Sequence, residues 1–83
     1  MANPKRTLEA VLSGRGVVAF SDLQRLLVGL GFNLARVSGS HHIYLHPKVP
    51  RPMNIQRVGK DAKPYQIRQL RDMIREFGLN LDG

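Results

Sequence analysis

Hydrophobic residues recur at helical spacing in two segments of the chain, which predicts two amphipathic helices. The first is expected to begin at Ser21, with Gln24 completing a capping box, and to end at Gly31. The second is expected to begin at Pro64 and to end at Gly78. The apolar stripes are Leu23, Leu26, Leu27 and Leu30 in the first helix and Ile67, Leu70, Met73, Ile74 and Phe77 in the second.

Between these helices the period changes to two, which predicts strands at residues 33–38, 41–46 and 53–58. The short connections favour antiparallel pairing. Prolines at positions 47, 50 and 52 predict a loop between the second and third strands. The alternation puts apolar side chains on a core face and polar ones on an open face. The apolar set is Ile43, Leu45, Met53 and Ile55, and the polar set is His42, Tyr44, Asn54 and Gln56.

The expected fold class is therefore α+β: a helix, a three-stranded antiparallel sheet and a second helix, with both helices covering the apolar sheet face. We expect one domain over residues 21–79, an N-terminal extension over 1–20 and a frayed tail over 80–83. Within the extension, residues 1–6 read as a leader, and Thr7 is the predicted cap of a short extra helix.

The charge of the chain indicates an anionic partner. Thirteen Lys and Arg residues against six Asp and Glu give a formal net charge of +7. Nucleic acid is the first candidate, and an acidic protein is the alternative. There is no cysteine, so disulfides and thiolate metal sites are excluded. No apolar run approaches the ~18 residues that a membrane span needs, so no membrane association and a cytoplasmic location are expected.

Three histidines fall within six residues, at His41, His42 and His46. Successive strand residues point to opposite faces, so His41 and His42 are poorly placed to share an ion. His42 and His46 share a face but lie about 13 Å apart along a strand, too far for one metal. We therefore expect neither a metal nor another cofactor.

Acid–base chemistry is the second interpretation of the histidines. An imidazole titrates near neutral pH and can take the proton of a ribose 2′-hydroxyl, whose oxygen then attacks the adjacent phosphate. Gly39 and Ser40, just before the histidine pair, let the backbone pass close to a ligand. The residue types also fit a non-catalytic alternative, in which the histidine pair is ordinary polar surface at the end of a strand.

Positive charge is concentrated on one side of the last helix and just before it. Arg68, Arg71 and Arg75 are spaced by three and four residues, and Lys60 and Lys63 precede the helix. Contacts from these residues to phosphates would position RNA without reading its sequence. The alternative is a solvated helix face.

The stretch from Ser21 to Leu79 resembles the HicA family of small bacterial toxins. The resemblance is carried by the helix ending Leu30-Gly31-Phe32, the motif Arg36-Val37-Ser38-Gly39-Ser40-His41-His42, the pair His46-Pro47, and the closing Phe77-Gly78-Leu79. It implies a double-stranded-RNA-binding-like fold, metal-independent cleavage of mRNA, and neutralisation by an acidic HicB-like antitoxin. It also implies that His41 is catalytic and that Gly39 supports it. The first 20 residues are additional to the shortest family members.

The residues expected to contact RNA combine the motif with the basic positions. They are Ser40, His42, Tyr44, Arg36, Lys60, Lys63, Arg68, Arg71 and Arg75. The alternation puts His41 at the rim of the core face, against a helix, and His42 on the open face. Two alternatives to the endoribonuclease are a non-catalytic RNA-binding module on the same fold and a domain whose charge serves only protein contacts.

Overall fold

The computed structural model describes residues 3–14 and 16–81. Its elements in chain order are α1 (Pro4–Ser13), α2 (Phe20–Gly29), β1 (Asn33–Ser38), β2 (His41–His46), β3 (Val49–Ile55), β4 (Arg57–Val58), β5 (Asp61–Ala62) and α3 (Pro64–Phe77). The fold is α+β, as predicted, and the helix–three strands–helix order agrees with a double-stranded-RNA-binding-like fold. The N-terminal helix is an addition to that order.

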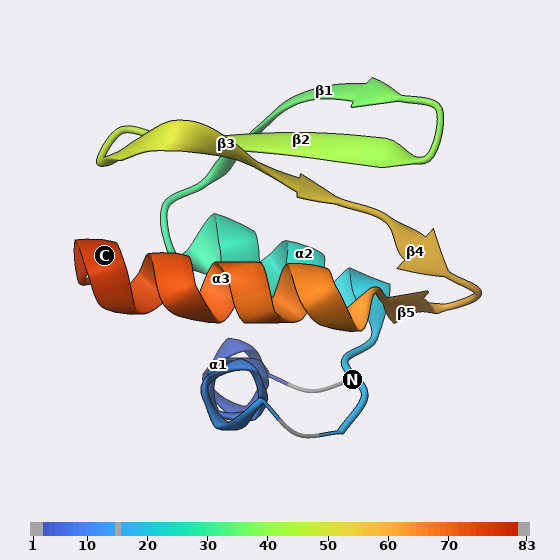
Figure 1. The fold of residues 1–83 in the computed structure, drawn as a ribbon, viewed down its shortest axis with the longest axis horizontal. Helices are drawn as coiled ribbons and strands as arrows, with labels where there is room; N and C mark the ends of the chain where they lie inside the picture. The colour runs from blue at the N-terminus through green and yellow to red at the C-terminus, as the bar shows by residue number, and fades with distance from the viewer. Residues whose placement is uncertain (1–2, 15, 82–83) are drawn as a thin grey trace.

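The elements form three layers, which are seen in Figure 1. Strands β1, β2 and β3 make an antiparallel sheet in that order. One face of the sheet, which we call the covered face, packs on α2 and α3, and it carries Tyr44, Met53 and Ile55. The opposite face, the open face, is covered by none of the helices that the structure describes. Helix α1 lies beyond α2 and α3, on the side away from the sheet.

The predicted apolar stripes of α2 and α3 are confirmed. Leu23, Leu26 and Leu27 of α2 are fully buried, and Leu70 of α3 is as well. The capping box is wrong, however. Helix α2 begins one residue early, at Phe20, without a side-chain cap, and the amide of Gln24 is used elsewhere. Burial of the stripe, rather than the cap, therefore stabilises this helix.

The apolar segment before α2 is extended and pairs with the hairpin formed by β4 and β5. The backbone N–H of Ala62 donates to the carbonyl of Val18 at 2.9 Å, and the N–H of Phe20 donates to the carbonyl of Lys60 at 2.9 Å. The predicted polar loop at residues 59–63 therefore contains β5, which pairs with β4 just before it. This pairing ties the start of α2 to the start of α3.

The N-terminal extension is more ordered than expected. Helix α1 begins at Pro4, and the side chain of Asn3 caps it by accepting from the N–H of Arg6 at 2.9 Å. Thr7 is not the cap but a buried residue within the helix. The Asn-Pro pair thus starts a helix, because proline suits the first helical position. Residues 1 and 2 of the predicted leader lie outside the described residues.

The C-terminal tail also departs from the prediction in part. Leu81 is partly buried against the hydrophobic core, and Leu79 is buried in it. The segment up to residue 81 is therefore packed instead of frayed. Residues 82 and 83 lie outside the described residues.

The prolines do not exclude a strand where a loop was predicted. Strand β3 starts at Val49, and both Pro50 and Pro52 lie within it. Because β3 is an edge strand of the sheet, it pairs only with β2. Proline has no N–H to donate, and an edge strand tolerates that loss where the nitrogen faces away from the neighbour. The predicted third strand at 53–58 is therefore displaced toward the N-terminus.

The two faces of β2 are the reverse of the prediction. Tyr44 is 2% exposed, whereas Leu45 is 49% exposed. His42 and His46, which share the parity of Tyr44, lie in edge-to-face contact with Phe20 and Phe32, at ring-centroid distances of 5.0 and 4.9 Å. Polar aromatic rings can occupy a core face when their polar atoms find partners, which alternation alone does not reveal.

Candidate functional site

The turn between β1 and β2 consists of Gly39 and Ser40. Ser38 pairs with His41 across it, so it is a two-residue hairpin turn. Gly39 has a φ of +60°, and no residue other than glycine has a positive φ in the described chain. A glycine with positive φ at the first central position is the pattern of a type II′ turn, which suits the twist of a hairpin. The turn makes His41 the first residue of β2.

His41 lies on the open face and is half-buried. Its Nδ1 is 3.2 Å from Oδ1 of Asn54 in β3. Asn54 pairs with Ile43, two residues along β2 from His41, so the two side chains meet diagonally across the strands. The predicted location of His41 against a helix is therefore wrong. The imidazole is fixed by a neighbouring strand and faces the side of the sheet that no helix covers.

Ser40 belongs to a chain of hydrogen bonds that leads to the start of α3. Nε2 of Gln56 donates to Oγ of Ser40 at 3.1 Å, and Nζ of Lys63 donates to Oε1 of Gln56 at 3.1 Å. The backbone N–H of Gln56 donates to Oε1 of the buried Gln66 at 2.7 Å. These bonds hold the β1–β2 turn against the end of β3 and bring the ammonium of Lys63 near it.

His46 has a structural environment. Its Nε2 is 2.9 Å from the carbonyl oxygen of Leu30, and its Nδ1 accepts from the N–H of Lys48 at 3.0 Å. A carbonyl oxygen only accepts, so Nε2 carries the proton and both ring nitrogens are used. A Cβ added at Gly31 would lie 2.9 Å from this Nε2, so glycine leaves the space that the ring needs.

His42 is likewise turned toward the helices. Its ring packs on Phe20, and its Nδ1 is 3.3 Å from the carbonyl oxygen of Ser40. The ring of Phe20 also has the guanidinium of Arg57 at 4.9 Å from its centroid. The prediction that His42 lies on the open face is therefore wrong.

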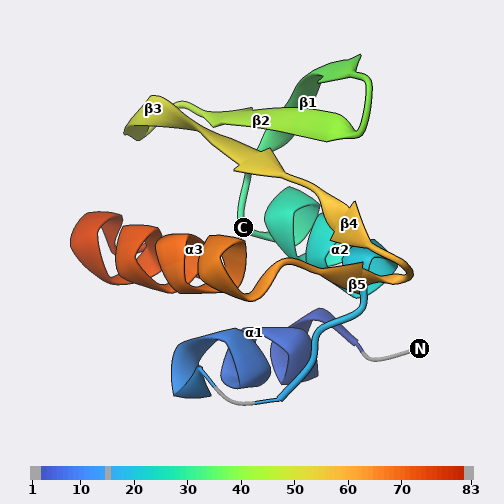
Figure 2. The same ribbon diagram turned by 45° about the vertical axis from the view of Figure 1, so that its right-hand side comes forward.

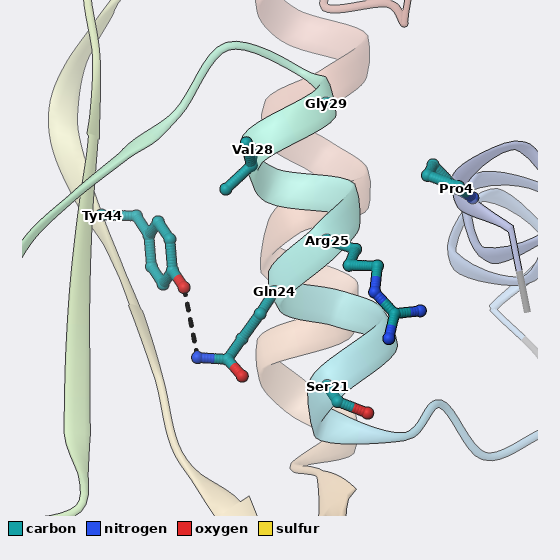
Figure 3. A pocket seen from close by; sticks show the side chains of 7 residues that line it. All are labelled: Pro4, Ser21, Gln24, Arg25, Val28, Gly29 and Tyr44. Atoms are coloured by element: carbon teal, nitrogen blue, oxygen red, sulfur yellow. Dashed lines mark hydrogen bonds between the residues drawn. The ribbon is translucent and has the colours of Figure 1, made fainter. Parts of the chain in front are cut away.

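The prediction that Tyr44 lies on the open face is also wrong. Figure 3 shows its ring reaching from β2 toward α2, where Nε2 of Gln24 donates to its hydroxyl at 3.3 Å. The two side chains line a groove along α2 together with Val28. A ring that is 2% exposed presents no face on which a base can stack.

The comparisons with known proteins identify the family. The family model described as the HicA toxin of bacterial toxin–antitoxin systems matches residues 20–79, well over half of the chain. The chain belongs to the HicA toxin family. No curated protein and no solved structure matches it significantly. Membership of a toxin–antitoxin family implies that this toxin has an antitoxin partner.

Helix α1 lies outside the matched residues of the toxin and occupies part of the predicted RNA-binding helix face. Nη2 of Arg75 donates to the carbonyl oxygen of Leu12 at 3.3 Å. The Nη1 atom of Arg71 lies 3.1 Å from the position of a Cβ added at Gly14, the residue that ends α1. Cations at the C-terminal end of a helix stabilise its dipole. Arg71 and Arg75 therefore hold α1, on the side of α3 away from the sheet.

The other basic candidates are distributed differently. Arg36 is exposed and pairs with Ile43, which places it on the open face with His41. Lys60 is exposed in the turn between β4 and β5, which lies at the same end of the molecule as the β1–β2 turn in both Figure 1 and Figure 2. Lys63 follows that turn, and Arg68 is exposed on α3. Lys60 and Lys63 therefore bring positive charge to the end of the molecule where the β1–β2 turn lies, and Arg36 adds positive charge on the open face.

The described part of the chain holds neither a cluster of metal-ligating side chains nor a membrane-spanning helix. Within residues 3–14 and 16–81, no three His, Asp or Glu side chains lie close enough together to hold a metal ion. None of the helices in that part of the chain is both long and apolar enough to cross a membrane.

Sequence reasoning missed Asn54 and Gln56 as site residues, although the alternation along β3 did predict that both point away from the core. The missing information was the orientation of β2. With His41 assigned to the opposite face, nothing joined it to Asn54. Had the rings of His42, Tyr44 and His46 been considered as buried, the same pattern would have brought His41 and Asn54 together.

The different environments of the histidines predict different effects on stability. Replacing His46 with Ala removes the partners of two backbone groups and a ring packed on Phe32, so a loss of about 2 kcal/mol in the free energy of unfolding is expected. Replacing His41, on the open face, is expected to cost under about 1 kcal/mol. Urea unfolding of both variants measures the difference, and equal losses would contradict the assigned roles.

Proposed function

We propose that the toxin is an endoribonuclease that cleaves mRNA without a metal and uses His41 as its general base. The observation that carries the proposal is the location of His41. It is a half-buried imidazole on the open face, directly after the Gly39-Ser40 turn, with Arg36 on the same face and Lys63 linked through Gln56 to Ser40. An mRNA substrate implies that the protein acts in the cytoplasm.

The chemistry requires a base, a held phosphate and a leaving group. His41 takes the proton of a 2′-hydroxyl, the 2′ oxygen forms a bond to the adjacent phosphorus, and the bond from phosphorus to the 5′ oxygen breaks. The 5′ oxygen takes a proton from a water molecule as it leaves, so the products are a 2′,3′-cyclic phosphate and a 5′-hydroxyl. The negative charge that grows on the phosphate favours nearby cations, for which Lys63 and Arg36 are the candidates.

Gly39 and Ser40 support this step by shaping the approach to His41. The turn has no Cβ at position 39, and a Cβ there would meet no atom within 4 Å. The requirement for glycine is therefore conformational, and it leaves the backbone open toward a ligand. The hydroxyl of Ser40, exposed beside His41, is a candidate donor to the same phosphate.

A nuclease assay tests the role of His41. The purified protein is incubated with RNA in EDTA, beside His41→Ala and His42→Ala variants whose urea midpoints are known. Loss of the general base is expected to lower the cleavage rate by at least about 100-fold, since such catalysis contributes roughly 10²–10⁴. His42→Ala serves as the matched control on the other face of the same strand.

The outcomes separate the alternatives. Equal cleavage by the wild type and His41→Ala would remove the role of His41. Cleavage lost in His42→Ala but kept in His41→Ala would transfer the role to His42. RNA binding without cleavage in any variant would favour the non-catalytic RNA-binding module.

The RNA-binding residues of the proposal are Arg36, Ser40, Lys60, Lys63 and Arg68, whereas Arg71 and Arg75 are assigned to α1. Two double variants on a His41→Ala background, Lys60→Gln/Lys63→Gln and Arg71→Gln/Arg75→Gln, remove the same charge from the two places. The lysine pair is expected to weaken RNA binding and to lower the slope of log affinity against log salt by about 0.7 for each phosphate that is no longer neutralised. The arginine pair is expected to change the slope by less.

Fluorescence anisotropy of a labelled single-stranded RNA at several salt concentrations gives both slopes. If the arginine pair has the larger effect, the RNA follows α3 and not the end of the sheet.

The antitoxin partner is proposed to be a HicB-like acidic protein that covers the open face. A net charge of +7 on the toxin favours an acidic surface, and covering His41 blocks access of RNA. If the reading frame next to the toxin encodes this partner, its purified product is expected to abolish cleavage at equimolar ratio. The complex is also expected to weaken as salt is raised. Inhibition with full access of His41 to a chemical modifier in the complex would contradict a covering partner.

A further inference from the structure

We propose that Asn54 is a positioning residue that fixes the protonation pattern of the His41 ring, so that Nε2 is the nitrogen that takes the substrate proton. The inference rests on the proposed function of His41. Asn54 was not among the residues that the sequence nominated, and it touches no reacting atom in the proposed step. Its effect is exerted through the imidazole.

The chemistry of the contact sets the tautomer. Nδ1 of His41 lies 3.2 Å from Oδ1 of Asn54. An amide oxygen is an acceptor only, so the ring nitrogen that faces it must carry the hydrogen. In a neutral imidazole the other nitrogen then holds the free lone pair. Nε2 of His41 is therefore the basic atom.

The same chain contains the opposite arrangement. In His46, Nε2 donates to the carbonyl oxygen of Leu30 and Nδ1 accepts from the N–H of Lys48. That ring is the Nε2–H tautomer, with both nitrogens used within the fold. His41 and His46 lie at the two ends of β2, and the partner of each ring determines which ring nitrogen carries the hydrogen.

The backbone makes Asn54 a rigid support. Pairs Ile43–Asn54 and His42–Ile55 set the register of β2 and β3. A diagonal neighbour on the same face of a sheet is within reach of a side chain. Both His41 and Asn54 are half-buried in regular strands, where side-chain positions are better defined than on a loop.

The test compares variants that keep or remove the acceptor. Asn54→Asp keeps an oxygen facing Nδ1, whereas Asn54→Leu has a similar size and no acceptor. Asn33→Leu is the matched control, because Asn33 pairs with Leu45 and so lies on the open face of β1, at the other end of the sheet from His41. Urea midpoints and the ring signals of His46 report whether each variant is folded.

The direct measurement is ¹⁵N NMR of the histidine rings at a pH where they are neutral, since protonated and unprotonated ring nitrogens have well-separated shifts. In the wild type, His41 is expected to show a protonated Nδ1 and His46 a protonated Nε2. Asn54→Leu is expected to shift His41 toward the Nε2–H form, and Asn33→Leu is expected to leave it unchanged.

The kinetic measurement uses cleavage of a short RNA. Asn54→Leu is expected to lower kcat by roughly 10–100-fold, the usual effect of removing a group that orients a functional histidine, with KM little changed. At saturating RNA, Asn54→Asp is expected to keep kcat within a few-fold of the wild type.

Two results would overturn the inference: an Nε2–H tautomer for His41 in the wild type, or a wild-type kcat in Asn54→Leu. The NMR result does not depend on activity. A wild type that cleaves no RNA therefore refutes the proposed nuclease function, while the tautomer of His41 still decides whether Asn54 orients the ring.

Discussion

The structure depends on one constraint, which is that the polar rings on the covered face of β2 lie against the helices because each finds a partner there. Tyr44 reaches Gln24, His46 bridges two backbone groups, and His42 packs on Phe20. An unpartnered polar group in such a place costs roughly 1–3 kcal/mol. With these rings turned toward the helices, the pleat of the strand places His41 on the opposite face.

The sequence predicted the elements whose signals are local. The leucine stripe of α2 and the apolar stripe of α3 are repeated at helical spacing over several turns, and a glycine marks the end of α3. The orientation of β2 was not predictable from alternation, because Ile43 and Leu45 look like the core set. The deciding information is tertiary: Phe20 and Phe32, outside β2, provide aromatic surface that histidine rings fit.

The other errors in the sequence prediction also arise because the deciding contacts are tertiary. Pro50 and Pro52 argue against a strand only if that strand has neighbours on both sides, and the order of strands is not a local property. Arg71 and Arg75 have the spacing of a basic helix face, as predicted. Their spacing could not predict that α1 packs against α3, with Arg71 and Arg75 next to the C-terminal end of α1. The resemblance to the family directed attention to His41, although the parity argument placed that residue on the wrong face.

The two-residue turn at Gly39 and Ser40 also fixes how this part of the chain can vary. Strand side chains alternate, so a slip of one residue in the pairing of β1 and β2 would exchange the two faces of β2. His41 would then point at the helices, and Leu45 would be driven into the space now filled by rings. The length of this turn is therefore as strictly constrained as the glycine at its first position.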